Sequence, residues 1–313
     1  MFEIKRYEPS HEQAWNDFVA RSKNGTFLFD RRFMDYHSDR FADSSLMILR
    51  KGRIYALLPA NRVGDTLHSH QGLTYGGLLT DAKATAEGVM EAFGTLNAWF
   101  RNEGVRRVTY KAMPWIYHRL PAEEDLYALT QVCHARLLTR EISSTILLQQ
   151  PLRFTESRKS GLRKALREGL YMEESGDLAA FWQMLDDNLA SRHHTHPVHS
   201  LDELRLLQGR FPQQIHLYFI YNKEKEPVGG TWVFDTGQVV HTQYIASTEE
   251  GKAHGALDLL FDELINRRYR EGIYLDFGKS TEEGGRVLNE HLIFQKEGFG
   301  GRGVCYDTYE WEP

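Results

Sequence analysis

The sequence has 313 residues, of which 41% are hydrophobic and 26% are charged, and this composition excludes a disordered, collagen-like or low-complexity chain. Its 38 Lys and Arg residues are outnumbered by 43 Asp and Glu residues, for a formal net charge of −5. No overall positive field therefore recruits nucleic acid, and a site for a polyanion has to be local.

Cysteine usage and hydropathy favour the cell interior. Cys133 and Cys305 form neither a disulfide framework nor a CxxC pair, which is typical of proteins in a reducing compartment. The first ten residues lack the apolar core of a signal peptide, and no window approaches the ~20 apolar residues of a membrane span. We therefore expect a soluble, cytoplasmic protein without a membrane span.

The first half of the chain is expected to contain a hairpin, an extended segment, a helix and a strand, in that order. The hairpin covers 46–63 with its turn at Lys51-Gly52, and the extended segment covers 66–79. Apolar residues at helical spacing predict the helix that follows: Val89, Met90, Phe93, Leu96 and Phe100. The strand is expected at 106–113.

The second half repeats this order and extends it. The expected elements are a hairpin at 215–234, a strand at 238–247, an amphipathic helix that includes Leu257, Leu260, Phe261, Leu264 and Ile265, a strand at 273–277, a short helix at 287–297 and a last strand at 304–311. A period of about half the chain is too long for a solenoid and indicates two similar domains in tandem.

The repeat predicts the fold class and the domain boundaries. We expect an α/β (α+β) protein with domains at 1–152 and 153–313, the second beginning with a basic junction helix at 153–175. Each domain is expected to hold a mixed, mainly antiparallel sheet flanked by helices, in which a long helix connects two parallel strands.

This order of elements resembles the GNAT acyltransferase fold, and the chain is similar to the FemA/FemB-like branch of that superfamily, in which two GNAT-like domains are fused. The segments that carry the resemblance are NGTFLFDRRFMDYHSDRF (24–41), SHQGLTYGGL (69–78), SRKSGLRKALREGL (157–170) and YLDFGKSTEEGGRVLNEHLIFQKEGFGGR (274–302). The resemblance implies an N-acyltransferase. Its donor would be acyl-CoA or aminoacyl-tRNA, and its acceptor a small molecule or precursor with a free amine, for example a cell-envelope precursor.

Candidate catalytic residues lie on two strands of the second half. Transfer to an amine requires the ammonium to lose a proton, and imidazole suits this role at neutral pH. We expect His241 to be the base and Tyr244 to donate a hydrogen bond to the leaving group or the oxyanion. Strand alternation would place His241, Gln243 and Ile245 on one face and Val240, Thr242 and Tyr244 on the other. A histidine satisfied within the sheet is the alternative interpretation.

Three residues near the end of the strand at 273–277 complete the predicted centre. Asp276, Lys279 and Ser280 lie where sheets commonly place ligands. The letters Gly278-Lys279-Ser280 do not indicate a P-loop, because that motif requires glycine where Ile273 stands. A solvated loop is the alternative.

A phosphate-binding turn is expected between 249 and 260, where a strand leads into a helix. Free amide groups and the helix dipole favour an anion there, and Gly251, Lys252, His254 and Gly255 are the candidate residues. In the resembled family, coenzyme A binds to a pattern of Arg or Gln, two residues, Gly, one residue, then Gly or Ala. With Gly251 as the central glycine, this chain has Thr248 in the first position and Ala253 in the last; with Gly255, it has Lys252 and Leu257. A simple helix start with a tight turn is therefore the alternative.

Further candidates for substrate contact are spread over the chain. His70 and Tyr75 occupy the matching strand of the first half. Histidines crowd into 193–199, where His196 and His199 are expected to contact the acceptor; neither HExxH nor cysteine pairs accompany them, so we expect no metal site. Arg158 and Lys159 begin a basic helical stripe that could hold phosphates of tRNA or a nucleotide-linked acceptor, or could simply be a solvated face.

Two functions from different classes therefore remain open. The first is an acyltransferase whose second domain keeps a gap between its central strands. The second is a non-catalytic protein of the same fold that binds a nucleotide-linked or peptide ligand, which the degenerate phosphate turn favours.

Overall fold

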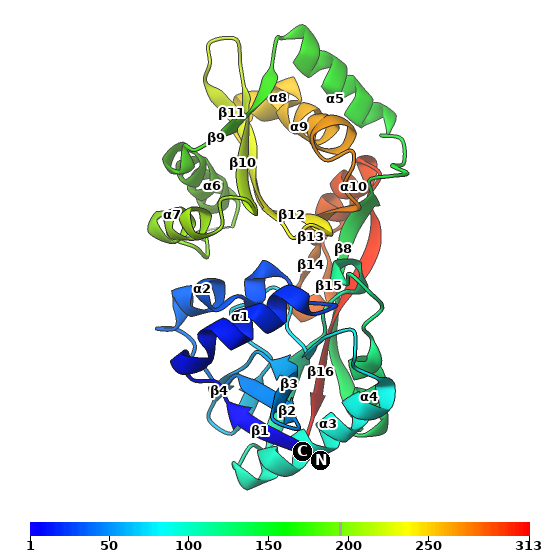
Figure 1. The fold of residues 1–313 in the computed structure, drawn as a ribbon. Coiled ribbons are helices and arrows are strands. Elements are labelled where there is room, and N and C mark those ends of the chain that lie inside the picture. Colours follow the sequence, from blue (N-terminus) through cyan, green and yellow to red (C-terminus); the bar gives the residue numbers. More distant parts are fainter. Residues whose placement is uncertain (194–195) are drawn as a thin grey trace. The chain divides into compact units, whose positions relative to one another are not determined.

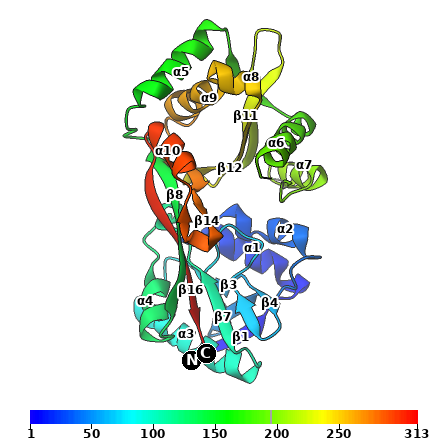
Figure 2. The same ribbon diagram turned by 180° about the vertical axis from the view of Figure 1, so that it is seen from behind.

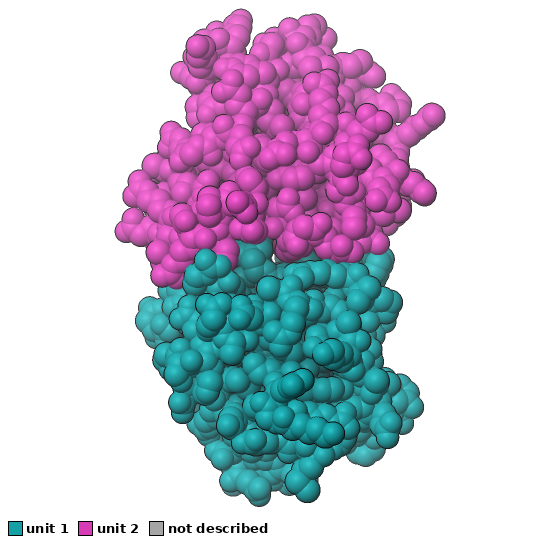
Figure 3. All heavy atoms as spheres, in the orientation of Figure 1, with its two compact units in different colours: residues 1–141, 281–287, 305–313 teal, residues 142–280, 288–304 magenta. Residues whose placement is uncertain are grey.

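The computed structural model describes residues 1–193 and 196–313 and divides into two compact units (Figure 3). Unit 1 comprises Met1–Glu141, Thr281–Val287 and Cys305–Pro313, whereas unit 2 comprises Ile142–Ser280 and Leu288–Val304. Each unit combines strands with helices, so the expected α/β (α+β) class is confirmed. Within the described residues, no helix is both long and apolar enough to cross a bilayer.

Unit 1 pairs its strands in two groups (Figure 1). Its elements are β1 (Phe2–Arg6), α1 (Glu12–Arg21), α2 (Arg31–Met34), β2 (Leu46–Arg50), β3 (Arg53–Leu58), β4 (Asn61–Val63), β5 (Thr66–His68), β6 (Leu79–Thr80), α3 (Ala86–Asn102), β7 (Arg107–Lys111) and α4 (Glu124–Gln131). One group has the order β1-β2-β3-β6. In the other, β5 is parallel to β7 and antiparallel to β4. The long helix α3 lies between the parallel strands β5 and β7 along the chain, as expected.

Unit 2 is built around the strand order β8-β13-β12-β11-β10-β9. Its elements are α5 (Glu156–Arg167), β9 (Tyr171–Ser175), α6 (Leu178–His193), α7 (Leu201–Arg210), β10 (Ile215–Tyr221), β11 (Pro227–Asp235), β12 (Val239–Ser247), α8 (Glu249–His254), α9 (Ala256–Glu263), β13 (Tyr274–Lys279) and α10 (Glu290–Gly298). β12 and β13 are parallel, and the other pairs are antiparallel.

A few strands connect the units along the chain. β8 (Arg136–Leu147) and β16 (Arg302–Trp311) each contain residues of both units, and the short strands β14 (Thr281–Glu282) and β15 (Val287–Leu288) pair with each other. The C-terminal part of β16 pairs with β7 in unit 1. The compact units therefore differ from a simple division of the chain at residue 152, because the last strand completes the sheet of the first unit.

The expected junction helix is shorter than the basic segment. α5 covers Glu156–Arg167 rather than 153–175, and residues Tyr171–Ser175 form β9, the edge strand that pairs with β10. The physical reason is Gly169, whose φ of +76° is a left-handed conformation that ends the helix. The chain can then enter the sheet two residues later.

The helices of unit 2 cover both faces of its sheet, as Figures 1 and 2 show from opposite sides. α5, α8 and α9 pack on one face over a core that includes Val240, Leu260 and Leu275. α6 and α7 pack on the other face, where Phe181 meets Phe219 edge to face. Two buried faces explain why these strands read as apolar runs.

The central strands of unit 2 pair over only part of their length. β12 and β13 are paired from Val239 with Tyr274 to His241 with Asp276, yet β12 continues to Ser247 and β13 to Lys279. Beyond His241 the two strands no longer share a register. The predicted gap between the central strands of the second half is therefore present.

Candidate active site

The strongest candidate site is an imidazole–carboxylate pair at the point where β12 and β13 stop pairing. His241 Nδ1 lies 2.8 Å from Asp276 Oδ2, and both side chains are buried, Asp276 completely. The second carboxylate oxygen, Oδ1, accepts hydrogen bonds from the hydroxyl groups of Ser143 at 2.5 Å and Thr145 at 2.8 Å on β8. The carboxylate is thus held by groups from both neighbouring strands.

These contacts fix the charge of Asp276 and the tautomer of His241. Burial alone would raise the pKa of Asp276, but the hydrogen bonds and charge interaction from His241 and the hydroxyl donors outweigh it and lower the pKa to about 2. An ionised carboxylate only accepts hydrogen bonds, so Nδ1 of His241 is the donor. In the neutral imidazole the lone pair is then on Nε2, the nitrogen that can take up a proton.

A buried lysine, which the sequence analysis missed, holds the loop after Asp276. Lys296 of α10 is 4% exposed, and its Nζ donates to the carbonyls of Gly278 at 2.7 Å and Lys279 at 2.9 Å and to Ser280 Oγ at 2.9 Å. Gly278 has a φ of +75°, and a Cβ there would lie 3.3 Å from Cε1 of His241. The loop that Lys296 fixes therefore packs against the imidazole.

The burial of Lys296 lowers its pKa to about 8, although the charge of Asp276 acts in the opposite direction. A sequence signal for this lysine did exist. Leu292, Lys296 and Phe299 follow at helical spacing and line the same cavity, so Lys296 lies within an apolar stripe where a solvated lysine would not be expected.

A largely apolar cavity of about 390 Å³ opens beside the diverging strands. Ile245, Ala246 and Ser247 of β12 line it together with Phe277, the residue that follows Asp276. Helices α6, α8, α9 and α10 supply the rest of the wall, including both Lys252 and Lys296. Its volume is within the range of small-molecule sites.

The strand register corrects one prediction. A bulge at Gln243 interrupts the pairing of β11 and β12, since Trp232 is opposite Tyr244 while Val233 is opposite Thr242. Ile245 consequently packs against the same core cluster as Val240, which simple alternation would place on the other face. The predicted division of faces was therefore wrong beyond the bulge.

Tyr244 contacts a residue of the histidine-rich segment. Its hydroxyl lies 2.6 Å from His199 Nδ1, and its ring is stacked with Trp232. Burial raises the pKa of Tyr244 to about 12, so it stays protonated at neutral pH. His196 contacts Asp186 at 2.7 Å on α6, and His194 lies outside the described residues.

The predicted phosphate turn is closely packed. Thr248 Oγ1 accepts the amide hydrogen of Gly251 at 3.0 Å, and a Cβ at Gly251 would meet the carbonyl oxygen of Val228 at 1.9 Å. Gly255, with a φ of +76°, similarly approaches the backbone of Gly161 on α5. These contacts give both glycines a packing role. Lys252 pairs with Glu249 and lines the cavity, whereas Nδ1 of His254 is buried and has no hydrogen-bond partner among the residues that the structure describes.

The remaining predicted residues lie apart from the His241–Asp276 pair. Arg158 donates to Asp258 at 3.0 Å and joins α5 to α9, while Lys159 pairs with Glu156 on its own helix. In unit 1, His70 and Tyr75 are 3% and 2% exposed, and they lie between β5 and β6 rather than on the strand that the sequence predicted. Substrate contact by these residues stays a prediction. In the described part of the chain no cluster of three His, Cys, Asp or Glu side chains could hold a metal ion.

Known proteins share the fold of this chain. Residues 155–284 match the family described as Acetyltransferase (GNAT) domain. FemX is similar over 99% of this chain and 97% of its own, with a TM-score of 0.68 and 10% identity. L-PGS from Bacillus licheniformis is similar over 97% and 92%, with a TM-score of 0.59 and 13% identity. A tandem GNAT protein from the clavulanic acid biosynthesis pathway matches over 100% and 98%, with a TM-score of 0.51 and 12% identity. A search of curated proteins found no match.

The matched region contains β12, α8, α9 and β13, which border the cavity and carry the His241–Asp276 pair. Residues 155–284, less than half of the chain, match the GNAT acetyltransferase domain, and this match supports an acyltransferase. Over nearly its whole length it has the fold of FemX and of tandem GNAT proteins. The expected resemblance to the FemA/FemB-like group is confirmed at the level of the fold.

Proposed function

We propose that the chain transfers an acyl group to an amine in unit 2, with His241 as the general base. The observation that carries this proposal is the hydrogen bond between His241 and the ionised Asp276. It lies where β12 and β13 stop pairing, and residues further along the same strands, Ile245 and Phe277, line an apolar cavity. A general base of this kind contributes about 10²–10⁴-fold to a rate.

The reaction then follows from the tautomer of His241. Nε2 takes a proton from the acceptor ammonium, and the neutral amine attacks the carbonyl carbon of the donor. A C–N bond forms and the bond from that carbon to the leaving oxygen or sulfur breaks. The first proton is released from Nε2 to solvent, and the second, lost by the attacking nitrogen, passes through Nε2 to the leaving group. Asp276 stabilises the imidazolium that forms in each proton transfer. The remaining acceleration comes from positioning donor and acceptor together.

The packing at α8 supports an aminoacyl ester, such as aminoacyl-tRNA, over acyl-CoA as donor. A diphosphate at the α8 N-terminus would need free amide groups, but Thr248 already accepts from Gly251. Glu249 and Glu250 also lie in the first turn, where their charge opposes that of a phosphate. The residues present do not fit the diphosphate of coenzyme A at this turn. As acceptor we propose a free amine, with a cell-envelope precursor as the first candidate.

The test is a transfer assay with two donors. Wild-type protein is incubated with radiolabelled aminoacyl-tRNA or with radiolabelled acetyl-CoA, and with a nucleotide-linked peptidoglycan precursor that carries a free amine. We expect label in the acceptor from aminoacyl-tRNA only. His241→Gln should reduce the rate about 100-fold or more, with its thermal unfolding midpoint close to that of the wild type.

Each outcome bears on a different part of the proposal. Full activity of His241→Gln would refute the role of His241 as base. Transfer from acetyl-CoA alone would refute the aminoacyl donor and leave the acyl transfer itself in place. Binding of the acceptor without transfer from either donor would favour the non-catalytic ligand-binding protein.

A further inference from the structure

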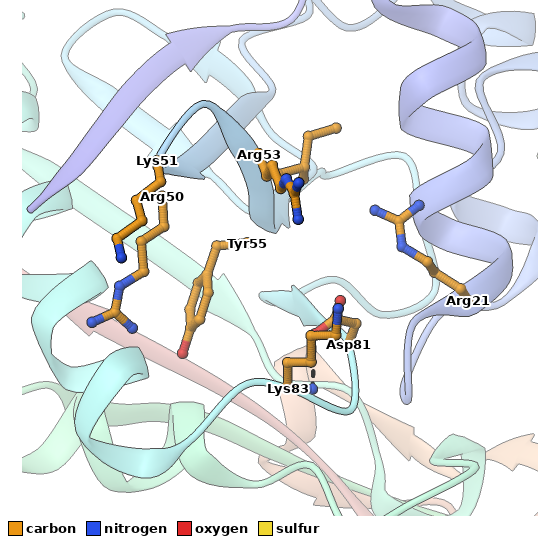
Figure 4. Close-up of a pocket in the computed structure, with 8 residues that line it drawn as sticks. Arg21, Arg50, Lys51, Arg53, Tyr55, Asp81 and Lys83 are labelled. Atoms are coloured by element: carbon orange, nitrogen blue, oxygen red, sulfur yellow. Dashed lines mark hydrogen bonds between the residues drawn. The ribbon is translucent and has the colours of Figure 1, made fainter.

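A strongly basic hollow of about 570 Å³ lies in unit 1, apart from the residues proposed for acyl transfer. Three segments surround it: the end of α1, the β2–β3 hairpin and the loop before α3. The charged residues that line it are Arg21, Arg50, Lys51, Arg53, Asp81 and Lys83. Figure 4 shows Arg21 and Arg53 projecting toward each other across the opening, with Tyr55 between Arg53 and Arg50.

Most of these cations have no carboxylate partner. Of the five cations that line the hollow, Arg50 alone forms an ion pair within the described part of the chain, with Glu91 at 3.7 Å. Asp81, the single acid of the lining, accepts from the backbone N–H of Lys83 at 2.9 Å. Arg21, Arg53 and Lys83 are exposed and lie in no ion pair within the described chain. The hollow thus concentrates positive charge on a chain whose net charge is −5.

A second hollow of unit 1 provides an internal comparison. It measures about 590 Å³ and is lined by Arg101, Arg106 and Arg107. There Arg106 lies 4.0 Å from Asp65, and Arg107 lies 3.7 Å from Glu310. Two of its three arginines are therefore neutralised locally, so accumulation of unpaired cations is a particular feature of the first hollow.

Part of this arrangement is costly to the fold, although the guanidinium groups of Arg21 and Arg50 also lie over the rings of Phe18 and Phe2, at 4.7 and 5.2 Å. Arg50 and Arg53 are directly opposite each other in the hairpin, and like charges at such positions are destabilising. Lys51, in the turn between them, adopts a φ of +52°, a conformation that favours glycine, asparagine or aspartate. Ligand binding would offset these local costs, because an anion would relieve the repulsion among the cations.

We propose that this hollow binds a small ligand that carries two or more phosphate groups. Guanidinium groups bind phosphate oxygens in pairs of parallel hydrogen bonds, and three arginines line this hollow, Arg21 from the end of α1 and Arg50 and Arg53 from the β2–β3 hairpin. RNA backbones follow extended grooves or stripes, whereas these cations enclose a hollow of ligand size. A compact diphosphate-bearing molecule therefore fits better than a polynucleotide. This inference does not depend on the proposed acyl transfer.

The experiment is isothermal titration of the full chain with inorganic pyrophosphate at low ionic strength. We expect saturable binding of one pyrophosphate per chain. Arg53→Glu and Arg21→Glu should each weaken it at least tenfold. Lys5→Glu, an equal charge change at an exposed position of unit 1, should leave it unchanged within twofold. Charge reversal could disturb folding, so Arg53→Gln and Arg21→Gln serve as milder variants. Each should reduce the affinity for pyrophosphate measurably, but less than the corresponding Glu variant.

Several results would overturn the proposal. One is the absence of saturable pyrophosphate binding, and another is equal weakening by Lys5→Glu, which would indicate a nonspecific charge effect. Equal competition by sulfate at matched ionic strength would likewise reduce the hollow to a general anion patch. If the chain bound a structured RNA through Arg53 but did not bind pyrophosphate, the ligand of the hollow would be RNA and the proposed small ligand would be wrong.

Discussion

The two units each contain a parallel strand pair that stops at a histidine, but what lies opposite that histidine differs. In unit 1, β5 and β7 are paired up to His68 opposite Thr109. In unit 2, β12 and β13 are paired up to His241 opposite Asp276. Only the second pair joins imidazole to carboxylate. Burial and the charge of Lys111 lower the pKa of His68, which disfavours its imidazolium.

The space beyond the two histidines also differs. In unit 1 the chain closes over it: Ser69 donates its N–H to the Thr109 carbonyl at 2.9 Å and accepts from the Lys111 N–H at 2.7 Å. Lys111 Nζ then holds the carbonyl groups of Gln71 and Leu73. In unit 2 the corresponding divergence borders the 390 Å³ cavity. A similar strand arrangement thus supports a closed core in one unit and a candidate reaction centre in the other.

The largest expected effect comes from removing the carboxylate that distinguishes unit 2. Asp276→Asn keeps the size of the side chain but removes the charge that orients His241 and stabilises its protonated form, so turnover should fall about 10²-fold or more. The pH profile of kcat should shift as well, which a merely structural change would not cause. His68→Gln in unit 1 is the matched control and should change turnover less than about twofold. Equal losses in both variants would break the distinction between the units.

A second difference concerns the two lysines that fix loops near the strand ends. Lys296→Met leaves three acceptors without their donor in a buried setting, so the free energy of unfolding should fall by about 2–4 kcal/mol. Lys111→Met should cost about 1 kcal/mol, because water can reach the partly exposed carbonyl groups it releases. Urea denaturation of both variants measures the two losses. A larger loss for Lys111→Met would contradict the assigned roles.

The elements and their order could be predicted from the sequence because apolar periodicity and turn residues act locally. The hairpin at 215–234 forms as β10–β11, and that at 46–63 forms as β2–β3 but ends at Leu58, since Asn61–Val63 is β4 in the other sheet. His241 and Asp276 could also be selected as candidates by their chemistry. Their pairing could not, because it depends on the register of two parallel strands whose residues are 35 positions apart.

Other features depended on tertiary packing and escaped the sequence analysis. The bulge at Gln243 moves Ile245 to the other face of the sheet, and no residue pattern in this segment of the sequence indicates it. The glycines of the expected phosphate turn reflect close backbone contacts at Gly251 and Gly255, which glycine letters alone cannot distinguish from an open anion site. Lys296 is buried because the α10 face that carries it closes the cavity.

The pH dependence of stability distinguishes Asp276 from Thr109, the residues that lie opposite His241 and His68 in the two parallel strand pairs. The pKa of Asp276 is about 2 in the folded chain against an ordinary value of 3.8. Its ionised form therefore contributes about 2 kcal/mol above pH ~4, and this contribution is lost as the pH falls from ~4 to ~2. The stability difference between wild type and Asp276→Asn should shrink by that amount over this range. For Thr109→Val the difference should stay constant, and a constant difference for both would refute the assignment.

The smallest expected effect tests whether the loop held by Lys296 positions His241. An alanine at Gly278 would be strained at a φ of +75°, and its Cβ would lie 3.3 Å from the imidazole. Gly237→Ala is the matched control, since its φ is +81° and nothing lies within 4 Å of the added Cβ. Both variants should lose about 1 kcal/mol of stability from backbone strain. Only Gly278→Ala should also reduce kcat, by a few-fold, because it displaces the base from its position beside Asp276. Equal kcat values for the two variants would show that the loop acts on stability alone, and the positioning of His241 would then rest on Asp276.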